Sequence, residues 1–236
     1  MNHIVAISGG KDSTALAVRL AEVEQRDYTY VCTPTGRELP EMIAHWDRLE
    51  EILGKPLIRV KAAVSLVDRI RLFKMLPSHH ARWCTRLTKI LPYQEWLADK
   101  VPAVSYVGLR ADEDRLGAVY DPQSGITQDY PLRRWGWGLN DVLGYLRKKH
   151  IIIPRRTDCD FCYDQRLSEW WELWKNHPVL WREAEGYEAE TDHTFRSPHR
   201  DTWPAALRDL RARFEAGEIP KVKLQDEYER CRVCSL

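Results

Sequence analysis

A glycine-rich segment near the N-terminus has the residue types and spacing of an anion-binding loop. It follows an apolar run at residues 3–7 and precedes an apolar-periodic stretch from Ala15, an order that predicts strand, turn and helix. Glycines let the backbone approach a ligand closely, and the N–H groups and dipole at a helix N-terminus attract phosphate or pyrophosphate. A lysine adds charge and three hydroxyls add donors. The candidate phosphate-binding residues are Ser8, Gly9, Gly10, Lys11, Asp12, Ser13 and Thr14.

Cysteine spacing gives a second chemical signal. The chain has six cysteines, and four of them form two CxxC pairs, Cys159 with Cys162 and Cys231 with Cys234. Each pair can present two thiolates to one metal ion, and four thiolates suit Zn²⁺ or an iron–sulfur cluster. Cys32 ends an apolar run, and we interpret it as a packed core thiol.

Composition narrows the class of protein. The chain has 236 residues, with 36 basic and 35 acidic side chains, so charge alone does not predict non-specific binding to nucleic acid. No apolar stretch reaches the length of a membrane span, and the N-terminus has no secretory pattern. We therefore expect a cytoplasmic protein without membrane contact, in which cysteines serve metal or redox chemistry rather than structural disulfides.

The elements that position these residues alternate along the first half of the chain. Alternating strands and helices predict an α/β fold, a parallel sheet flanked by helices. Because such sheets bind ligands at the carboxyl ends of their strands, segments 8–14, 32–38 and 108–115 should converge on one crevice. The expected strands are 3–7, 28–32, 57–60 and 104–107, and the expected helices are 13–25, 39–53 and 85–98.

The second half of the chain has a helical pattern. We expect helices at 139–149, 167–190 and 203–217. Four of the ten tryptophans stand at 170, 171, 174 and 181, where they could pack between helices or form a stacking surface for bases. We divide the chain into a nucleotide-binding α/β domain, 1–165, and a helical extension, 166–236, that carries the second CxxC pair and packs on the same domain.

The SGGKDST segment at 8–14 resembles the PP-loop of the ATP pyrophosphatase superfamily, also called the adenine nucleotide alpha hydrolases. Further segments, in the same order along the chain, resemble its phosphoadenosine phosphosulfate reductase branch: TG-x-E-x-PE at 35–41, GxRxxES…R at 108–115, and PL-x-x-W…DV at 131–142. Asp114 stands where that family often has serine. The resemblance implies ATP and Mg²⁺ as ligands. It implies catalytic roles for Lys11, Asp12, Arg110 and Glu113, and nucleotide contacts for Thr35, Gly36, Gly108 and Arg110.

The segment from Trp83 to Pro92 extends this resemblance to the cysteines. It is similar to the CC-x-x-x-K-x-x-P segment of iron–sulfur sulfonucleotide reductases, with Trp83 in place of the first cysteine. The resemblance implies a [4Fe–4S] cluster on Cys84, Cys159 and Cys162, with Cys231, Cys234 or a non-protein group as the fourth ligand. Structural Zn²⁺ is the alternative.

The complete loop decides between the activities that the resemblance offers. Sulfonucleotide reductases usually carry a degraded loop, so the complete SGGKDS indicates an ATP pyrophosphatase that adenylates a substrate and releases pyrophosphate. Together with the cysteines, it resembles enzymes of tRNA thiolation and, more closely, of DNA phosphorothioation. That implies a sulfur donor and an acceptor that is a nucleic acid or a small molecule. The alternatives are a reductase of adenylyl sulfate or phosphoadenosine phosphosulfate, and a non-catalytic nucleotide-binding protein with structural zinc.

Overall fold

The first expected strand lies at the centre of a five-stranded parallel sheet in the order β3-β2-β1-β4-β5. The structure is a computed structural model that describes residues 1–117 and 120–221. Four strands fall where the sequence predicts them. The fifth, β5, was not expected, because three of its four residues are polar. The strands are β1 (Asn2–Ala6), β2 (Tyr28–Cys32), β3 (Leu57–Arg59), β4 (Ala103–Tyr106) and β5 (Ile126–Asp129).

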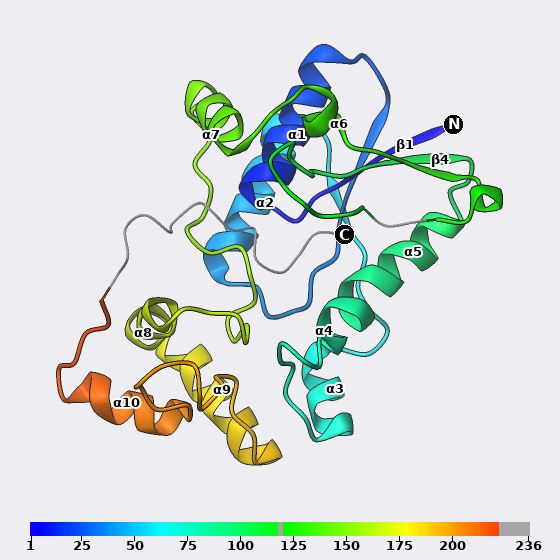
Figure 1. Cartoon of the computed structure of the whole chain (residues 1–236). Helices are drawn as coiled ribbons and strands as arrows, with labels where there is room; N and C mark the ends of the chain where they lie inside the picture. The colour runs from blue at the N-terminus through cyan, green and yellow to red at the C-terminus, as the bar shows by residue number, and fades with distance from the viewer. Residues whose placement is uncertain (118–119, 222–236) are drawn as a thin grey trace.

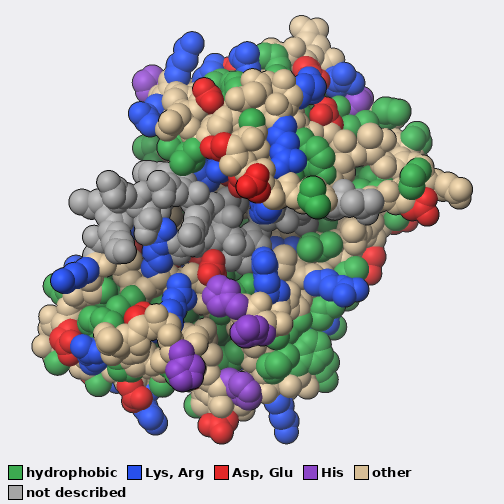
Figure 2. Space-filling view, viewed as in Figure 1, with side chains coloured by type: hydrophobic (Ala, Val, Ile, Leu, Met, Phe, Trp, Pro, Cys, Tyr) green, Lys and Arg blue, Asp and Glu red, His purple; other side chains and the backbone are tan. Residues whose placement is uncertain are grey.

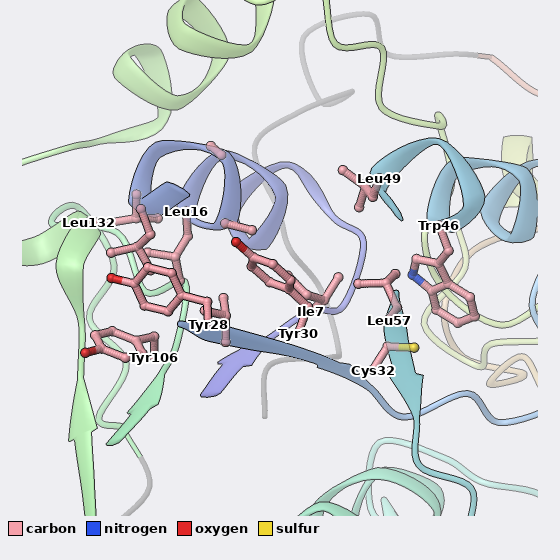
Figure 3. Close-up of a cluster of buried hydrophobic side chains, with 14 of the residues drawn as sticks. Ile7, Leu16, Tyr28, Tyr30, Cys32, Trp46, Leu49, Leu57, Tyr106 and Leu132 are labelled. Carbon is pink, nitrogen blue, oxygen red and sulfur yellow. The ribbon is translucent and has the colours of Figure 1, made fainter. Parts of the chain in front are cut away.

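Alternating side chains of β1 and the residue after it divide the core into two layers. Val5 and Ile7 pack in one cluster with Leu16, and Ile4 and Ala6 pack in another with Leu97 on the opposite face. This alternation is expected for a strand whose successive side chains point to opposite faces. Figure 3 shows the first of these clusters, in which the helix after β1 lies over the sheet. The expected arrangement of a parallel sheet with helices on both faces is therefore confirmed.

Helix boundaries follow local sequence signals. Helix α2 has a proline at its first position and is followed by the capping residue Gly54, whose φ of 64° suits glycine. Ser65 caps α3 by accepting a hydrogen bond from the backbone N–H of Asp68. The helices of the α/β part are α1 (Lys11–Val23), α2 (Pro40–Leu53), α3 (Leu66–Phe73), α4 (Trp83–Thr85), the π-helical η1 (Arg86–Ile90), α5 (Leu91–Ala98), the 3₁₀ turn η2 (Pro122–Ser124), α6 (Pro131–Arg134) and α7 (Leu139–Lys148).

The helical part differs from the prediction at two places. The expected helix 167–190 is two helices, α8 (Leu167–Asn176) and α9 (Pro178–Thr191), because the chain leaves helical geometry at His177 before Pro178. The expected helix 203–217 begins later, as α10 (Leu207–Glu215). These helices gather beside α3 in the lower part of Figure 1. Trp170 and Trp181 are fully buried between them, which favours the packing interpretation of these two tryptophans.

The surface agrees with the balanced composition. Acidic and basic side chains are interspersed on the face that Figure 2 shows. Among the described residues, no helix combines the length and apolar character needed to cross a bilayer.

Candidate functional site

The loop between β1 and α1 is held by hydrogen bonds within itself. The backbone N–H groups of Ser8 and Gly9 donate to Ser13 Oγ at 3.2 and 3.1 Å, and that hydroxyl donates to the Gly10 carbonyl at 3.2 Å. Gly9 has a φ of 81°, a conformation that favours glycine. The predicted loop therefore exists as a strand–turn–helix junction, and Ser13 shapes it from within.

Lys11, Asp12 and Arg110 form a buried charge cluster at the first turn of α1. Lys11 Nζ lies 3.1 Å from Asp12 Oδ2, and Arg110 Nη1 lies 3.1 and 3.0 Å from the two Asp12 oxygens. Burial opposes the charge on Arg110, but Asp12 and its other carboxylate neighbours outweigh that effect and raise the Arg110 pKa. One carboxylate thus holds both candidate phosphate-binding cations, and Arg110 comes from a strand end 98 residues after Asp12 in the sequence.

Residues 108–113 complete this cluster. A Cβ on Gly108 would lie 3.0 Å from the backbone of Asp12 and Ser13, so the close approach of the β4 end to α1 requires glycine. Glu113 Oε2 accepts the Arg110 backbone N–H at 3.1 Å, and Asp112 accepts Arg110 Nε at 2.8 Å. Segments 8–14 and 108–115 converge as predicted.

The segment after β2 is organised by a carboxylate that the sequence analysis did not place in the site. Glu38 Oε1 accepts the Thr35 backbone N–H and hydroxyl, both at 2.7 Å, and Glu38 Oε2 accepts the Gly36 N–H at 3.0 Å. Glu38 also forms an isolated antiparallel bridge with Cys159. The Thr35 hydroxyl lies 3.2 Å from the Cys159 sulfur. The candidate nucleotide segment and the first CxxC pair are therefore neighbours.

Arg37 holds the segment after β2 against the first CxxC pair. Its Nε donates to Asp160 Oδ1 at 3.2 Å, its Nη2 donates to the other oxygen, and its carbonyl accepts the Asp160 N–H at 2.8 Å. Burial raises the pKa of Asp160 to about 6, against the opposing effect of Arg37. Arg37 Nη1 also reaches Glu183 on α9 at 2.6 Å. One side chain thus ties the strand end, the CxxC segment and the helical part together.

Two adjoining cavities connect the loop to the cysteines. The loop cavity is lined by Ser8 together with Thr33, Glu38, Trp46 and Thr157, among others, and the thiol cavity is lined by Cys84, Cys159 and Cys162 with Thr35 and Tyr163. They share four wall residues, Thr85, Lys89, Asp158 and Cys159. Thr85 and Lys89 come from the stretch around η1, and π-helical turns are frequent at functional sites. Thr33 belongs to segment 32–38, which was expected at the crevice. Trp46 and Thr157 had no signal in the sequence, since they stand outside the recognised spacings.

The cysteines are brought together only in part. Cys84, Cys159 and Cys162 line one cavity, as their predicted association requires. No group of three or more histidine, cysteine, aspartate or glutamate residues within 1–117 and 120–221 has the arrangement of a metal site. Cys231 and Cys234 lie outside the described residues. Cys32 is buried in the core, where burial raises its pKa to about 12, which confirms its interpretation as a core thiol.

A buried histidine supports the loop from α2. His45 Nε2 lies 3.3 Å from Thr14 Oγ1, and burial lowers the pKa of His45 to about 4. The imidazole is therefore neutral near pH 7. The Thr14 side chain that it contacts is fully buried. We interpret this pair as a packing contact between α2 and the start of α1.

Known proteins resemble the chain along most of its length. It is 26% identical over 195 residues to an uncharacterized protein of Methanocaldococcus jannaschii. The aligned region covers 77% of this chain and 40% of that relative. The chain therefore spans about two fifths of the relative's length. A crystal structure of phosphoadenylyl-sulfate (PAPS) reductase from Candida auris, in a phosphate complex, has 15% identity and a TM-score of 0.48 over 65% of this chain and 75% of that chain.

A second solved structure and a family comparison complete these findings. The crystal structure of a predicted subunit of tRNA methyltransferase from M. jannaschii has 16% identity and a TM-score of 0.35, over 64% of this chain and 89% of that chain. The sequence model of the phosphoadenosine phosphosulfate reductase domain matches residues 2–155, which include the loop, Arg110 and Cys84. The chain belongs to the phosphoadenosine phosphosulfate reductase domain family, a branch of the PP-loop superfamily.

Proposed function

We propose that this protein is an ATP pyrophosphatase that adenylates an acceptor, releases pyrophosphate and serves sulfur transfer of the nucleic-acid thiolation or phosphorothioation type. The observation that carries the proposal is the complete loop with Lys11 and Arg110 buried around Asp12, beside a cavity that adjoins a second one lined by three thiols. Family membership supports nucleotide binding by this site. The proposed sulfur transfer is supported by the three thiols that line the second cavity.

The arrangement suits cleavage between the α and β phosphates of ATP. An acceptor oxygen would bond to the α-phosphorus while the bond from that phosphorus to the bridging oxygen breaks, and pyrophosphate would leave with the electron pair. Lys11, Arg110 and the N–H groups of the loop would bind the anionic phosphates. Asp12 would give up part of its contact with these cations as the phosphates arrive. Glu113 would keep the Arg110 backbone in place.

The described residues fit Mg²⁺ only in part. Asp12 is the nearest carboxylate of the loop, but it is shared between Lys11 and Arg110, so the ion would be held chiefly by the phosphates of ATP. Bound there, Mg²⁺ offsets charge on the leaving pyrophosphate.

For a metal at the cysteines, the donor type fits and the arrangement of the described residues does not. The thiolates of Cys84, Cys159 and Cys162 suit a [4Fe–4S] cluster, with Zn²⁺ as the alternative. We include this metal in the proposal and derive no step through it. Iron, zinc and acid-labile sulfide per chain, measured on anaerobically purified protein, would test it. About four iron and four sulfide are required for the cluster, and zinc without iron would contradict it.

Product analysis with ATP as the probe tests the activity. We expect AMP and pyrophosphate from the wild type and neither from a Lys11→Ala, Asp12→Ala double variant. Lys55→Ala with Asp27→Ala is the matched control, because it removes an exposed Lys–Asp pair. Thermal unfolding would show that each variant is folded.

The two alternative functions predict other outcomes. Thiol-dependent sulfite release from adenylyl sulfate or its phosphorylated form, without ATP cleavage, would indicate a reductase. The thiol cavity beside the loop cavity suits such a thiol step as well. ATP binding with no product from either nucleotide would indicate a non-catalytic protein. Either result would overturn the proposed activity.

A further inference from the structure

An indole N–H faces the loop cavity without a hydrogen-bond partner. Trp46 is 5% exposed, it lines that cavity, and its Nε1 is buried with no acceptor among the described residues. A buried donor without a hydrogen-bond partner destabilises the folded state, because it has lost its bond to water and gained none in return. Such a group in a cavity wall points to a ligand atom that accepts its hydrogen bond.

The donor is turned toward the double glycine. A Cβ on Gly9 would lie 2.6 Å from Trp46 Nε1, so the indole edge occupies the space that the missing side chain leaves. Figure 3 shows Trp46 on α2 with its nitrogen on the side of the β1–α1 loop. Trp170 and Trp181 also have buried Nε1 atoms without partners, but they pack in the helical cluster. Trp46 therefore differs from these two tryptophans because its buried N–H lies at the loop cavity.

A second donor lies beside the next glycine of the loop. A Cβ on Gly10 would lie 3.6 Å from Thr157 Oγ1 and 3.5 Å from Ser8 Oγ. Thr157 lines the same cavity as Trp46. It stands two residues before Cys159, so its hydroxyl reaches the loop from the cysteine segment.

We propose that the Trp46 indole N–H and the Thr157 hydroxyl are two donors for one oxygen of a tetrahedral oxyanion bound on the glycine loop. The cavity that both side chains line has an enclosed volume of about 20 Å³, which is room for one water-sized atom. It admits a single phosphate or sulfate oxygen, while the rest of the anion lies over the loop N–H groups. This inference rests on the proposed function, and it adds two binding residues that lie outside the recognised motifs.

Binding of inorganic pyrophosphate by calorimetry tests the assignment. Trp46→Phe keeps an aromatic ring beside Gly9 and removes the donor, and Thr157→Val keeps the shape and removes the hydroxyl. Because hydrogen bonds to charged groups are the strong ones, we expect each variant to weaken binding about tenfold. Trp170→Phe is the matched control, since it removes an equally buried indole N–H far from the loop, and we expect its affinity to equal that of the wild type. Thermal unfolding would confirm that all variants are folded.

Two nucleotide arms identify the source of the oxygen. A tenfold loss with ATP and none with adenylyl sulfate assigns the oxygen to a phosphate beyond the α position. A tenfold loss with adenylyl sulfate that AMP does not show assigns it to the sulfate. Unchanged affinity of both variants for pyrophosphate and both nucleotides would overturn the inference and leave a bound water as the partner of Trp46. A wild type that binds none of the three would overturn the proposed function itself.

Discussion

The loop end of the candidate site and its cysteine end are held in place by different forces. At the loop, Lys11, Asp12 and Arg110 are each at most 8% exposed and bind one another. At the cysteine end, the three thiols line a small cavity among apolar neighbours such as Phe161 and Leu66. Among the described residues, these thiols do not have the arrangement of a metal site.

This difference separates what the chain can organise by itself from what needs a further component. Buried charges that satisfy one another keep their geometry before any ligand arrives, as preorganised sites require. The three thiols line a cavity without the arrangement of a metal site. They can take up that arrangement only when a metal binds or when residues beyond those described complete the ligand set. The predictions below test this contrast from its strongest consequence to its weakest.

Removing Arg110 should have the largest effect on stability. Arg110→Ala leaves the buried Asp12 carboxylate with Lys11 alone, and breaking a buried pair costs about 3–5 kcal/mol. We expect a loss of about 3 kcal/mol in the free energy of unfolding, measured by urea denaturation. Arg134→Ala is the matched control, because that exposed guanidinium binds Glu24 and Asp129 and should cost less than about 1 kcal/mol. Equal losses of unfolding free energy in the two variants would show that the buried charge cluster at the loop stabilises the fold no more than an exposed ion pair does.

The helical part should lose stability as pH rises. Glu188 on α9 accepts the backbone N–H groups of Phe195 and Leu207 at 2.9 and 2.7 Å, and burial raises its pKa from 4.5 to about 7. The folded state therefore binds more protons than the unfolded state between these pH values. The contribution of Glu188 to the stability of the folded state is complete below pH 4.5 and is lost as pH rises through 7.

A comparison with Glu188→Gln isolates this group from the other titrating residues. The difference in unfolding free energy between wild type and variant should change by about 3 kcal/mol between pH 4.5 and 7, at 1.36 kcal/mol per pKa unit. Urea denaturation at a series of pH values measures it. Parallel profiles for the two proteins would show that Glu188 does not titrate in this range.

The sequence predicted most accurately those features that depend on neighbours along the chain. The loop, the strand before it, the helix after it and the glycine at 108 follow from short patterns, because hydrophobic periodicity and glycine turns are local rules. The three segments at strand ends, 8–14, 32–38 and 108–115, then converge by the topology of a parallel sheet. Even the burial of Cys32 could be read from its apolar run.

The missed features depend on contacts between distant segments. Trp46 and Thr157 reach the loop from α2 and from the segment before Cys159, and no spacing rule relates them to Gly9. Arg37 is an unspecified position of the TG-x-E-x-PE segment, and its role depends on Asp160, 123 residues away. Strand β5 has a weak apolar pattern, and its pairing with β4 decides its conformation. Such tertiary contacts override local preference.

Two glycines with similar backbone angles should differ in their tolerance of a side chain. Gly9 has a φ of 81° and Gly36 a φ of 80°. A Cβ on Gly9 would lie 1.8 Å from Met42 Cε and 2.6 Å from Trp46 Nε1, whereas a Cβ on Gly36 meets nothing within 4 Å. We expect Gly9→Ala to cost about 2–3 kcal/mol, from overpacking and from strain. Gly36→Ala should cost about 1 kcal/mol, from strain alone. Chemical denaturation measures both, and equal values would show that the loop is not tightly packed.

The smallest effect on stability is expected at the cysteines. Cys84 is only partly buried, so Cys84→Ser should change the unfolding free energy of metal-free protein by roughly 1 kcal/mol or less. If the thiols bind a metal, the same change should lower the metal content per chain and remove the stabilisation that the metal gives to the wild type. Cys32→Ala is the control for metal content, because that thiol lies in the sheet core and should leave the stoichiometry unchanged. A large loss of stability for Cys84→Ser in metal-free protein would mean that the thiol is itself a packing element. The cysteine end would then be held by its own contacts, as the loop end is.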